Sequence, residues 1–372
     1  MKKILTKRLR NGVLPTVAAL GLAGVTACHD IDDYQTDPQG VFSQLWTVMD
    51  EHYCFFAEKE QMYRDEYAAT PGGERGEAEW KRTWSWDEVR ARYGAMISNE
   101  MSDEELFDVC AEMINELKDG HTNLSAPFNT SYYTKWWSDY PQNYNERIVE
   151  EYYFNFNYQS TGGIKYGILQ ENIGYVRYPS FSYAIGEGNL DAILAYCATC
   201  SGLIVDVRDN GGGSMTNVET LVGRFTDKSI KVGSICHKDG PGHDDFSKPF
   251  DYYINPAEKG RVMWGKPIVV LCNRSTFSAA NNFVSVMKGL PNVTIVGSTT
   301  GGGSGMPFSS ELANGWGIRF SASPVRDAQG ELTEFGVEPD VAVDMDAEEA
   351  LAGRDTMLDT AIRVASGGNA GN

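Results

Sequence analysis

The hydrophobic pattern of the chain changes near residue 126. Before that point, apolar residues recur three and four positions apart, as they do on one face of an α-helix. The segment 102–120, SDEELFDVCAEMINELKDG, is the clearest case, and its Ser102 and Glu105 match a capping box. Gly120 is typical of the residue that ends a helix. The pattern predicts an N-terminal helical domain at 37–125.

After residue 126, short β-branched runs alternate with helical segments, which is typical of an α/β sheet covered by helices. KYGILQ and NIGYVRYPSF predict a hairpin. The further strands that we expect are GLIVDVRD, PIVVLCN, TIVGSTT and WGIRFSASPV. The expected helices are DAILAYCA, MTNVETLVGRF and SAANNFVSVMKGL. The segment 132–158 is aromatic and polar, and predicts a loop with irregular strands. We assign 126–372 to one core domain.

The first residues predict export rather than a part of the fold. Residues 1–27 combine a basic start with an apolar run that is too short to span a bilayer and ends in small residues, as in a signal peptide. The run ends in VTAC, which is similar to the lipobox of bacterial lipoproteins, with Cys28 as the lipidated residue. The alternative is an ordinary signal peptide followed by an incidental cysteine. Residues 28–36 then form a tether, and the protein is expected at the bacterial envelope, on the periplasmic or the cell-surface side.

Composition narrows the range of partners. The formal net charge is −19 over 372 residues, which disfavours nucleic acid and anionic membrane surfaces. The expected contact with the membrane is therefore through the lipid anchor alone. An apolar content of 42% allows a large core without disulfides or metals. Cys197 and Cys200 form a lone CxxC, a weak metal signal that we interpret as a helix end packed on the core, with or without a local disulfide.

Candidate chemistry begins at the end of a predicted buried strand, in PIVVLCNRSTFSAANNF (267–283). Ser275, Thr276 and Ser278 stand where a helix begins, so a hydroxyl here is either a helix cap or a nucleophile. At Ser278 the following N–H, that of Ala279, would point toward an oxyanion formed on the hydroxyl.

Three further segments carry polar groups that suit the same chemistry. The glycines of DVRDNGGGS (206–214) allow a close backbone approach and offer N–H groups, although a bare GGG is more often a mobile turn. His121 in LKDGHTNL follows the predicted end of a helix, where a general base would be held in place. GELTEFGVEPDVAV (330–343) offers Glu331, Glu334 and Glu338 as groups that orient a histidine.

In the order DGHT, GYVRYPSF, DVRDNGGG, STFSAA and GVEPD, these segments resemble a known superfamily of serine peptidases. It contains the C-terminal processing (tail-specific) peptidases, the tricorn core protease and the interphotoreceptor retinoid-binding protein. The resemblance implies a crotonase/ClpP-like β-α-β spiral core and Ser278 as the nucleophile. It also implies an oxyanion hole formed by the N–H of Ala279 and of a loop glycine, Gly211 or Gly212. About 50 residues separate DGHT from NIGYV, too few for the PDZ domain of some members, so none is expected.

The superfamily has two catalytic designs, and the residues favour one of them. Gly303 stands where the processing peptidases carry the lysine of a Ser–Lys dyad. No lysine follows Lys288, so the resemblance points to the tricorn-type design, with Ser278, His121 and Glu334. Asn281 departs from the family, which usually has a glutamate there.

The sequence therefore predicts a serine endopeptidase that cleaves peptides or unfolded proteins through an acyl-enzyme, with no metal or organic cofactor. Its acidic pH limb is expected near the ordinary histidine pKa of about 6.5. The alternative is a non-catalytic protein on the same fold that binds peptides or apolar ligands in an aromatic groove. The groove would be formed by Tyr132, Tyr133, Trp136, Trp137, Tyr152, Tyr153 and Phe154. Only the enzyme requires His121 to reach Ser278.

Overall fold

The computed structural model describes residues 35–69 and 84–368. The predicted signal peptide and Cys28 lie outside these residues, as does most of the predicted tether. Gln35–Asn372 form one compact unit. Within the described part, no helix combines the length and the apolar character that a bilayer crossing needs.

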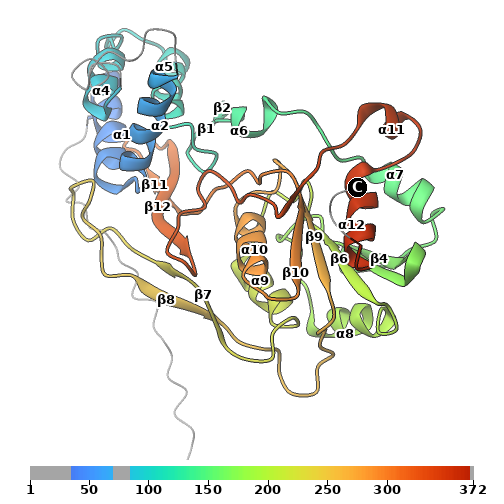
Figure 1. The fold of residues 1–372 in the computed structure, drawn as a ribbon. Helices are drawn as coiled ribbons and strands as arrows, with labels where there is room; N and C mark the ends of the chain where they lie inside the picture. The colour runs from blue at the N-terminus through green and yellow to red at the C-terminus, as the bar shows by residue number, and fades with distance from the viewer. Residues whose placement is uncertain (1–34, 70–83, 369–372) are drawn as a thin grey trace, which may run out of the picture. The chain divides into compact units, whose positions relative to one another are not determined.

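The N-terminal region is helical, as its periodicity predicts (Figure 1). Its helices are α1 (Pro38–His52), α2 (Phe56–Ala68), α4 (Trp86–Gly94) and α5 (Asp103–Asn115). The predicted capping box is present, since Ser102 and Glu105 bond reciprocally at the start of α5. The prediction that Gly120 ends this helix is wrong, because α5 ends at Asn115. Gly120 is small for another reason: a Cβ there would lie 2.5 Å from Trp136 Nε1 and 2.9 Å from Phe277 Cζ.

The described residues form two sheets, and the N-terminal helices pack on the smaller one. That six-stranded sheet has the order β2-β1-β12-β7-β8, with β11 also paired to β12. Side chains of β1 and β12, such as Leu124, Ile318 and Phe320, share a buried cluster with the helices. The domain boundary at 125/126 stays a prediction. The strands are β1 (Asn123–Ala126), β2 (Asn129–Tyr132), β7 (Ile230–Ile235), β8 (Phe250–Ile254), β11 (Gly305–Glu311) and β12 (Gly317–Asp327).

The larger sheet is seven-stranded in the described residues, with the order β13-β10-β9-β6-β5-β4-β3. Its strands are β3 (Gln159–Thr161), β4 (Ile164–Leu169), β5 (Ile173–Arg177), β6 (Gly202–Asp206), β9 (Ile268–Cys272), β10 (Val293–Gly297) and β13 (Val341–Ala342). The five strands from β13 to β5 are parallel, and β5, β4 and β3 are antiparallel neighbours. The predicted hairpin is thus β4–β5. The α/β class is confirmed.

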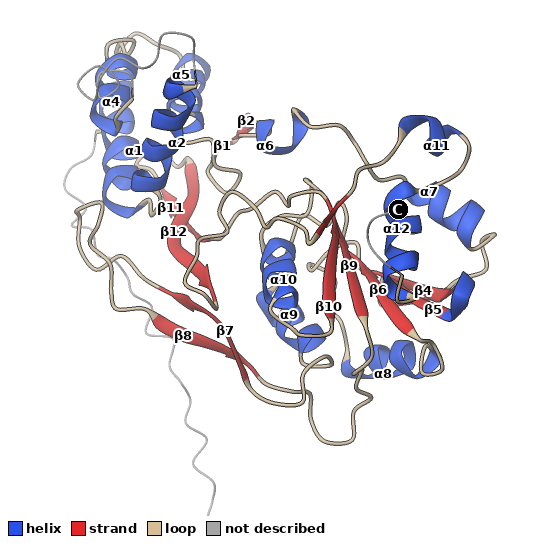
Figure 2. Cartoon of the chain, in the orientation of Figure 1, coloured by secondary structure: helices blue, strands red, loops and turns tan. Residues whose placement is uncertain are grey.

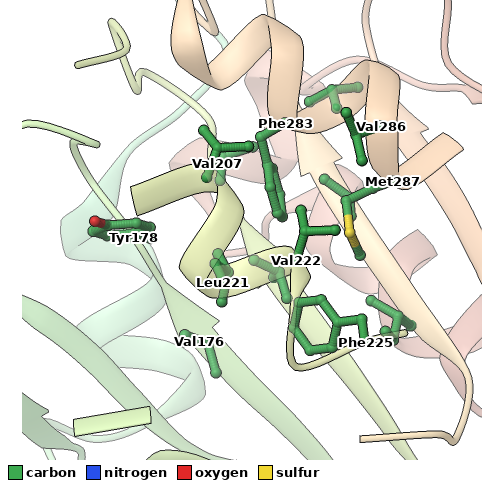
Figure 3. Close-up of a cluster of buried hydrophobic side chains, with 14 of the residues drawn as sticks. Val176, Tyr178, Val207, Leu221, Val222, Phe225, Phe283, Val286 and Met287 are labelled. Atoms are coloured by element: carbon green, nitrogen blue, oxygen red, sulfur yellow. The ribbon is translucent and has the colours of Figure 1, made fainter. Parts of the chain in front are cut away.

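Helices cover both faces of the larger sheet (Figure 2). Alternate residues of β6 and β9 point to opposite faces of the sheet. Because helices cover both faces, both strands are buried along their whole length. One face packs against α8 (Glu187–Tyr196), α9 (Met215–Val222) and α10 (Ala279–Lys288). Figure 3 shows part of this core, where Phe283 and Met287 of α10 lie beside Leu221 and Val222 of α9. The other face packs against α12 (Thr356–Ala365).

The remaining short elements were not resolved by the sequence pattern. The aromatic segment after residue 132 contains helical turns rather than irregular strands. The helical turns of the aromatic segment are α6 (Lys135–Ser138), α7 (Glu146–Ile148) and the π-helical η1 (Val149–Tyr153). The other short elements are the 3₁₀ turn η2 (Gln170–Asn172) and α11 (Ala347–Leu351). Cys197 and Cys200, at the end of α8, are free thiols buried in the core, as the packing interpretation predicts.

Candidate active site

Ser278 lies at the turn between β9 and α10. Its φ of 57° and ψ of −122° belong to a region that costs a residue other than glycine roughly 1–3 kcal/mol. The Ser278 N–H donates to the Gly302 carbonyl at 2.8 Å, which holds the residue in this conformation. A strained turn from a buried strand into a helix is a geometry that presents a nucleophilic hydroxyl at the edge of a sheet.

The neighbouring hydroxyl of Thr276 has a structural role. Thr276 is fully buried, and its Oγ1 accepts from the Asn273 N–H at 3.0 Å and donates to the Val207 carbonyl at 2.8 Å. The Phe277 N–H donates to the Asn210 carbonyl at 3.0 Å. These bonds join the turn that carries Ser278 to the loop that follows β6.

His121 lies next to Ser278, although the two residues are far apart in the sequence. Its Nε2 lies 2.9 Å from Ser278 Oγ, across 157 residues of sequence. The His121 backbone is held by Asp119, whose Oδ1 accepts the His121 N–H at 2.7 Å. For the Ser278 hydroxyl to donate to Nε2, the imidazole must carry its proton on Nδ1. Within the described residues, His121 Nδ1 is buried and has no hydrogen-bond partner.

Burial controls the protonation of His121. The side chain is 3% exposed, and this desolvation lowers the pKa of His121 to about 4, although nearby Asp119 favours the charged form. The imidazole is therefore neutral, and able to accept a proton, well below neutral pH. Protonation of His121 would therefore reduce the reaction rate only at a pH below the value of about 6.5 that is expected from the sequence.

Glu334 is buried near the site but does not contact the His121 ring. Its Oε2 accepts the Ser304 N–H at 2.8 Å, and its Oε1 lies 3.5 Å from Lys59 Nζ. Burial, and then the nearby Asp119 carboxylate, raise the pKa of Glu334, while Lys59 opposes this rise. The predicted contact between Glu334 and the imidazole is thus absent from this structure, because Lys59 and Ser304 bind the carboxylate instead.

The other two glutamates considered from the sequence are exposed. Glu331 lies in a turn where its N–H donates to Asp327 Oδ1, and the Glu338 carbonyl accepts from Lys288. Among the three, only Glu334 shares an electrostatic environment with Asp119.

The predicted oxyanion donors surround Ser278 unequally. The Ala279 N–H is in the first turn of α10, where helices leave N–H groups without internal partners. The Gly212 N–H donates to Asn210 Oδ1 at 3.0 Å and is occupied in this structure. Gly212 still lies against the nucleophile, since a Cβ there would be 2.8 Å from Ser278 Cβ. Gly211 remains the predicted loop donor.

The two departures from the family pattern have local explanations. Gly303 has a φ of 78°, and a Cβ there would lie 2.5 Å from the Phe277 ring, so the backbone excludes a side chain at this position. Asn281 is fully buried, and its side chain bonds to Thr333 and to Thr300 Oγ1. It joins the first turn of α10 to Thr333, which precedes Glu334, and to the loop that follows β10.

A groove of about 910 Å³ is lined by Trp136, Arg274 and Phe335, among others, and by none of Ser278, His121 and Glu334. Trp136 lies at its edge and stacks on Phe277 with a ring separation of 4.1 Å. Tyr132 and Tyr133 also line it, but the hydroxyl of Tyr153 bonds to Asp359 of α12. The seven aromatic residues considered from the sequence therefore do not line a single groove.

Sequence reasoning missed Asp119 and Lys59. Asp119 belongs to the DGHT segment, and its position two residues before His121 was an available signal. Lys59 lies in α2, whose sequence FAEKEQMYRDEYA is polar, so nothing in the pattern marks it as a buried lysine. In the described part of the chain, no group of three or more His, Cys, Asp or Glu residues is arranged to hold a metal ion.

Comparison with known proteins finds a family model that matches part of the chain and a solved structure that matches most of it. The model of peptidase family S41 matches residues 172–343. A candidate peptidase from Parabacteroides merdae, known from a crystal structure, is 43% identical, with 89% of this chain and 97% of that chain covered and a TM-score of 0.79.

Two curated relatives match over shorter stretches. The carboxy-terminal processing protease CtpA of Bacillus subtilis is 30% identical over 176 residues, and the tricorn protease of Thermoplasma acidophilum is 28% identical over 193 residues. The matches cover 47% and 51% of this chain, but only 35% and 16% of those relatives.

Proposed function

Because the chain belongs to peptidase family S41, we propose that it is a serine endopeptidase that cleaves peptides or unfolded proteins at the cell envelope. The observation that carries the proposal is the 2.9 Å distance between His121 Nε2 and Ser278 Oγ at a strained strand-to-helix turn. A binding protein on the same fold has no need of this pair, so the geometry favours the enzyme.

The proposed mechanism follows the serine-hydrolase pattern. His121 takes the proton from Ser278 Oγ as the oxygen attacks the substrate carbonyl. The Ala279 N–H and the Gly211 N–H hold the tetrahedral oxyanion, and His121 then gives its proton to the leaving amine. Water releases the acyl group from Ser278 in the second half of the reaction. The negative charge that supports the imidazolium comes from Asp119, which in turn interacts with Glu334.

The substrate is proposed to lie as an extended chain in the groove beside the Ser278 turn. Trp136, which stacks on Phe277 next to Ser278, lines this groove together with Arg274 and Phe335. Arg274 holds this wall in place, because its side chain donates to the carbonyls of Trp136 and Thr300. Backbone and aromatic contacts of this kind fit peptides without demanding one sequence.

A fluorophosphonate probe tests the proposed function. We expect it to label Ser278, and Ser278→Ala to abolish both labelling and peptide hydrolysis. His121→Ala should slow labelling by about 10²–10⁴, the usual contribution of a general base. The matched control is Ser275→Ala, which should label like the wild type. Labelling at Ser275, or hydrolysis that survives Ser278→Ala, contradicts the assignment.

The envelope location is tested at the N-terminus. Mass spectrometry of the membrane-extracted protein should find a mature chain that begins with acylated Cys28. Cys28→Ser should release the protein from the membrane fraction. A mature chain that starts at another residue and carries no lipid contradicts this part of the proposal.

A further inference from the structure

Lys59 is a buried cation beside the proposed active site. Its side chain is 1% exposed, and its Nζ lies 3.5 Å from Glu334 Oε1 and 5.0 Å from the centre of the Phe335 ring. It stands in the first turn of α2, so it comes from the N-terminal helical region. Ion pairs on the surface contribute little to stability, but this pair has almost no contact with solvent.

The groups that face Glu334 come from several elements. Asp119 precedes His121, and its carboxylate interacts with both Lys59 and Glu334. Tyr53 and Cys54, between α1 and α2, are neutral, because burial raises the pKa of each well above its ordinary value. Arg319 of β12 is a second cation within range of Asp119 and His121. Lys59 is the group that hydrogen-bonds to the Glu334 side chain as a cation.

We infer that Lys59 is a positioning residue of the active site, which favours the ionised forms of Glu334 and Asp119 and thereby helps His121 to take the Ser278 proton. The inference rests on the proposed function. It makes the N-terminal helical region part of the catalytic apparatus rather than a separate module.

The charges around His121 show how this cation acts. The Asp119 carboxylate favours an imidazolium at His121, whereas the second cation, Arg319, opposes it. The Glu334 and Asp119 carboxylates repel each other, and Lys59 compensates part of this repulsion. Without Lys59, the repulsion is less compensated, and Glu334 holds a proton up to a higher pH.

A different view is that Lys59 only stabilises the fold. A buried ion pair adds little net stability over a pair of apolar residues, but removal of one partner alone leaves a buried charge and is strongly destabilising, so Lys59→Met should also be less stable. A structural role would change the unfolding temperature, but it would leave the shape of the pH–rate profile unaltered. The pH profile therefore separates the two roles.

The experiment measures fluorophosphonate labelling and peptide hydrolysis against pH for the wild type, Lys59→Met and Glu334→Gln. In Lys59→Met we expect kcat at neutral pH to fall about tenfold or more, with KM little changed. The acidic limb should move up by about one pH unit or more, since a unit corresponds to a tenfold change. Part of the activity should return at alkaline pH. Lys59→Arg, which keeps the charge, should restore the limb toward the wild-type position.

The matched control is Lys165→Met. Lys165 also binds two carboxylates, those of Glu146 and Glu150, but its side chain is 33% exposed and it lies on β4. It should leave the pH profile unchanged. In a Glu334→Gln background, Lys59→Met should cause little further loss, because both changes act on one interaction.

Each outcome decides the inference. A Lys59→Met enzyme whose limb stays at the wild-type pH overturns it, even if the rate or the unfolding temperature falls. If Lys59→Met does not fold, the Lys59→Met/Glu334→Gln double variant, which should fold, replaces it as a test. In Glu334→Gln alone, the acidic limb of the pH–rate profile that is due to Glu334 should disappear. If that limb persists in Glu334→Gln, the inference is wrong. A wild type that the probe does not label at Ser278 overturns the proposed function, and this inference with it. If the wild type is labelled at Ser278 but the acidic limb of Lys59→Met stays at the wild-type pH, the inference about Lys59 is wrong and the proposed function stands.

Discussion

At the scale of single residues, the site depends on groups whose ionisation is set by burial. His121, Asp119, Glu334 and Lys59 are each at most 6% exposed. In this environment, the charged form of one group depends on the charges of the others rather than on solvent. The protonation of the proposed site therefore follows from which partners the fold brings together, and the pKa of His121 lies below the ordinary histidine value.

The stability of the protein should depend on pH through His121. Its pKa is about 6.5 in the unfolded chain and about 4 in the native state, so unfolding takes up a proton between these values. The contribution of His121 to the free energy of unfolding should decrease as the pH falls from about 6.5 toward 4. Glu334, with its pKa raised to about 7, contributes with the opposite sign, so the His121 part is read from the difference between the wild type and a His121 variant. Urea unfolding at pH 7 and pH 5 measures this difference.

His121→Gln serves as the test variant for this pH dependence, because it removes the titrating group and keeps a polar side chain. Its loss of stability between pH 7 and pH 5 should be smaller than that of the wild type. His237→Gln is the matched control, since His237 is a partly exposed histidine in a loop and should leave the pH dependence unchanged. An identical pH dependence in wild type and His121→Gln contradicts the prediction.

At the scale of elements, the turn after β9 and the loop after β6 act as one unit. Gly212 is the point where they meet. Its φ is 97°, and a Cβ there would lie 2.7 Å from the Phe277 carbonyl oxygen and 2.9 Å from the Ala279 nitrogen. Neither the backbone conformation nor the space suits a side chain.

Gly212→Ala should therefore displace the Ser278 turn. We expect the rate of fluorophosphonate labelling to fall by about 10² or more, comparable to the loss of one oxyanion donor. The control is Gly188→Ala on α8, where an added Cβ meets nothing within 4 Å and a helical alanine is favoured by up to about 1 kcal/mol. Wild-type labelling by Gly212→Ala contradicts this account of the two loops.

At the scale of the whole molecule, a buried ion network joins the core strands to the C-terminal helix. Arg208, which follows β6, donates to Asp206 and to Asp355, and all three side chains are fully buried. Asp355 also caps α12, since its Oδ1 accepts the Leu358 N–H at 2.9 Å. The network therefore ties the segment that leads to Gly211 and Gly212 to a helix 147 residues further along the chain.

Arg208→Met should destabilise the protein by about 3–5 kcal/mol, because it leaves two buried carboxylates without their cation. Urea unfolding at neutral pH measures the change. Arg147→Met is the matched control, since Arg147 forms an exposed pair with Glu151 and its loss should cost about 0.5 kcal/mol or less. If the two substitutions cost the same, the network is not what holds α12 to the core.

The sequence by itself determined the features that depend on local order. The period of the apolar residues predicted α5 and its capping box, and the continuous apolar runs predicted β6 and β9, because a helix face or a buried strand is encoded by neighbours in the chain. The motifs also placed Ser278 at a strand-to-helix turn. The strands β7 and β8 were missed, since their pairing depends on partners that local patterns do not specify.

Only the tertiary structure decided which polar groups meet. The distance between His121 and Ser278 spans 157 residues, and that between Lys59 and Glu334 spans 275. A polar helix such as α2 does not reveal which of its lysines will be buried, because burial depends on what packs against it. The same holds for Glu334, whose carboxylate binds Lys59 and Ser304 rather than the imidazole that its position in the motif suggested. Charge pairing acts through space in a medium of low dielectric, and its partners are fixed only when the fold brings distant segments together.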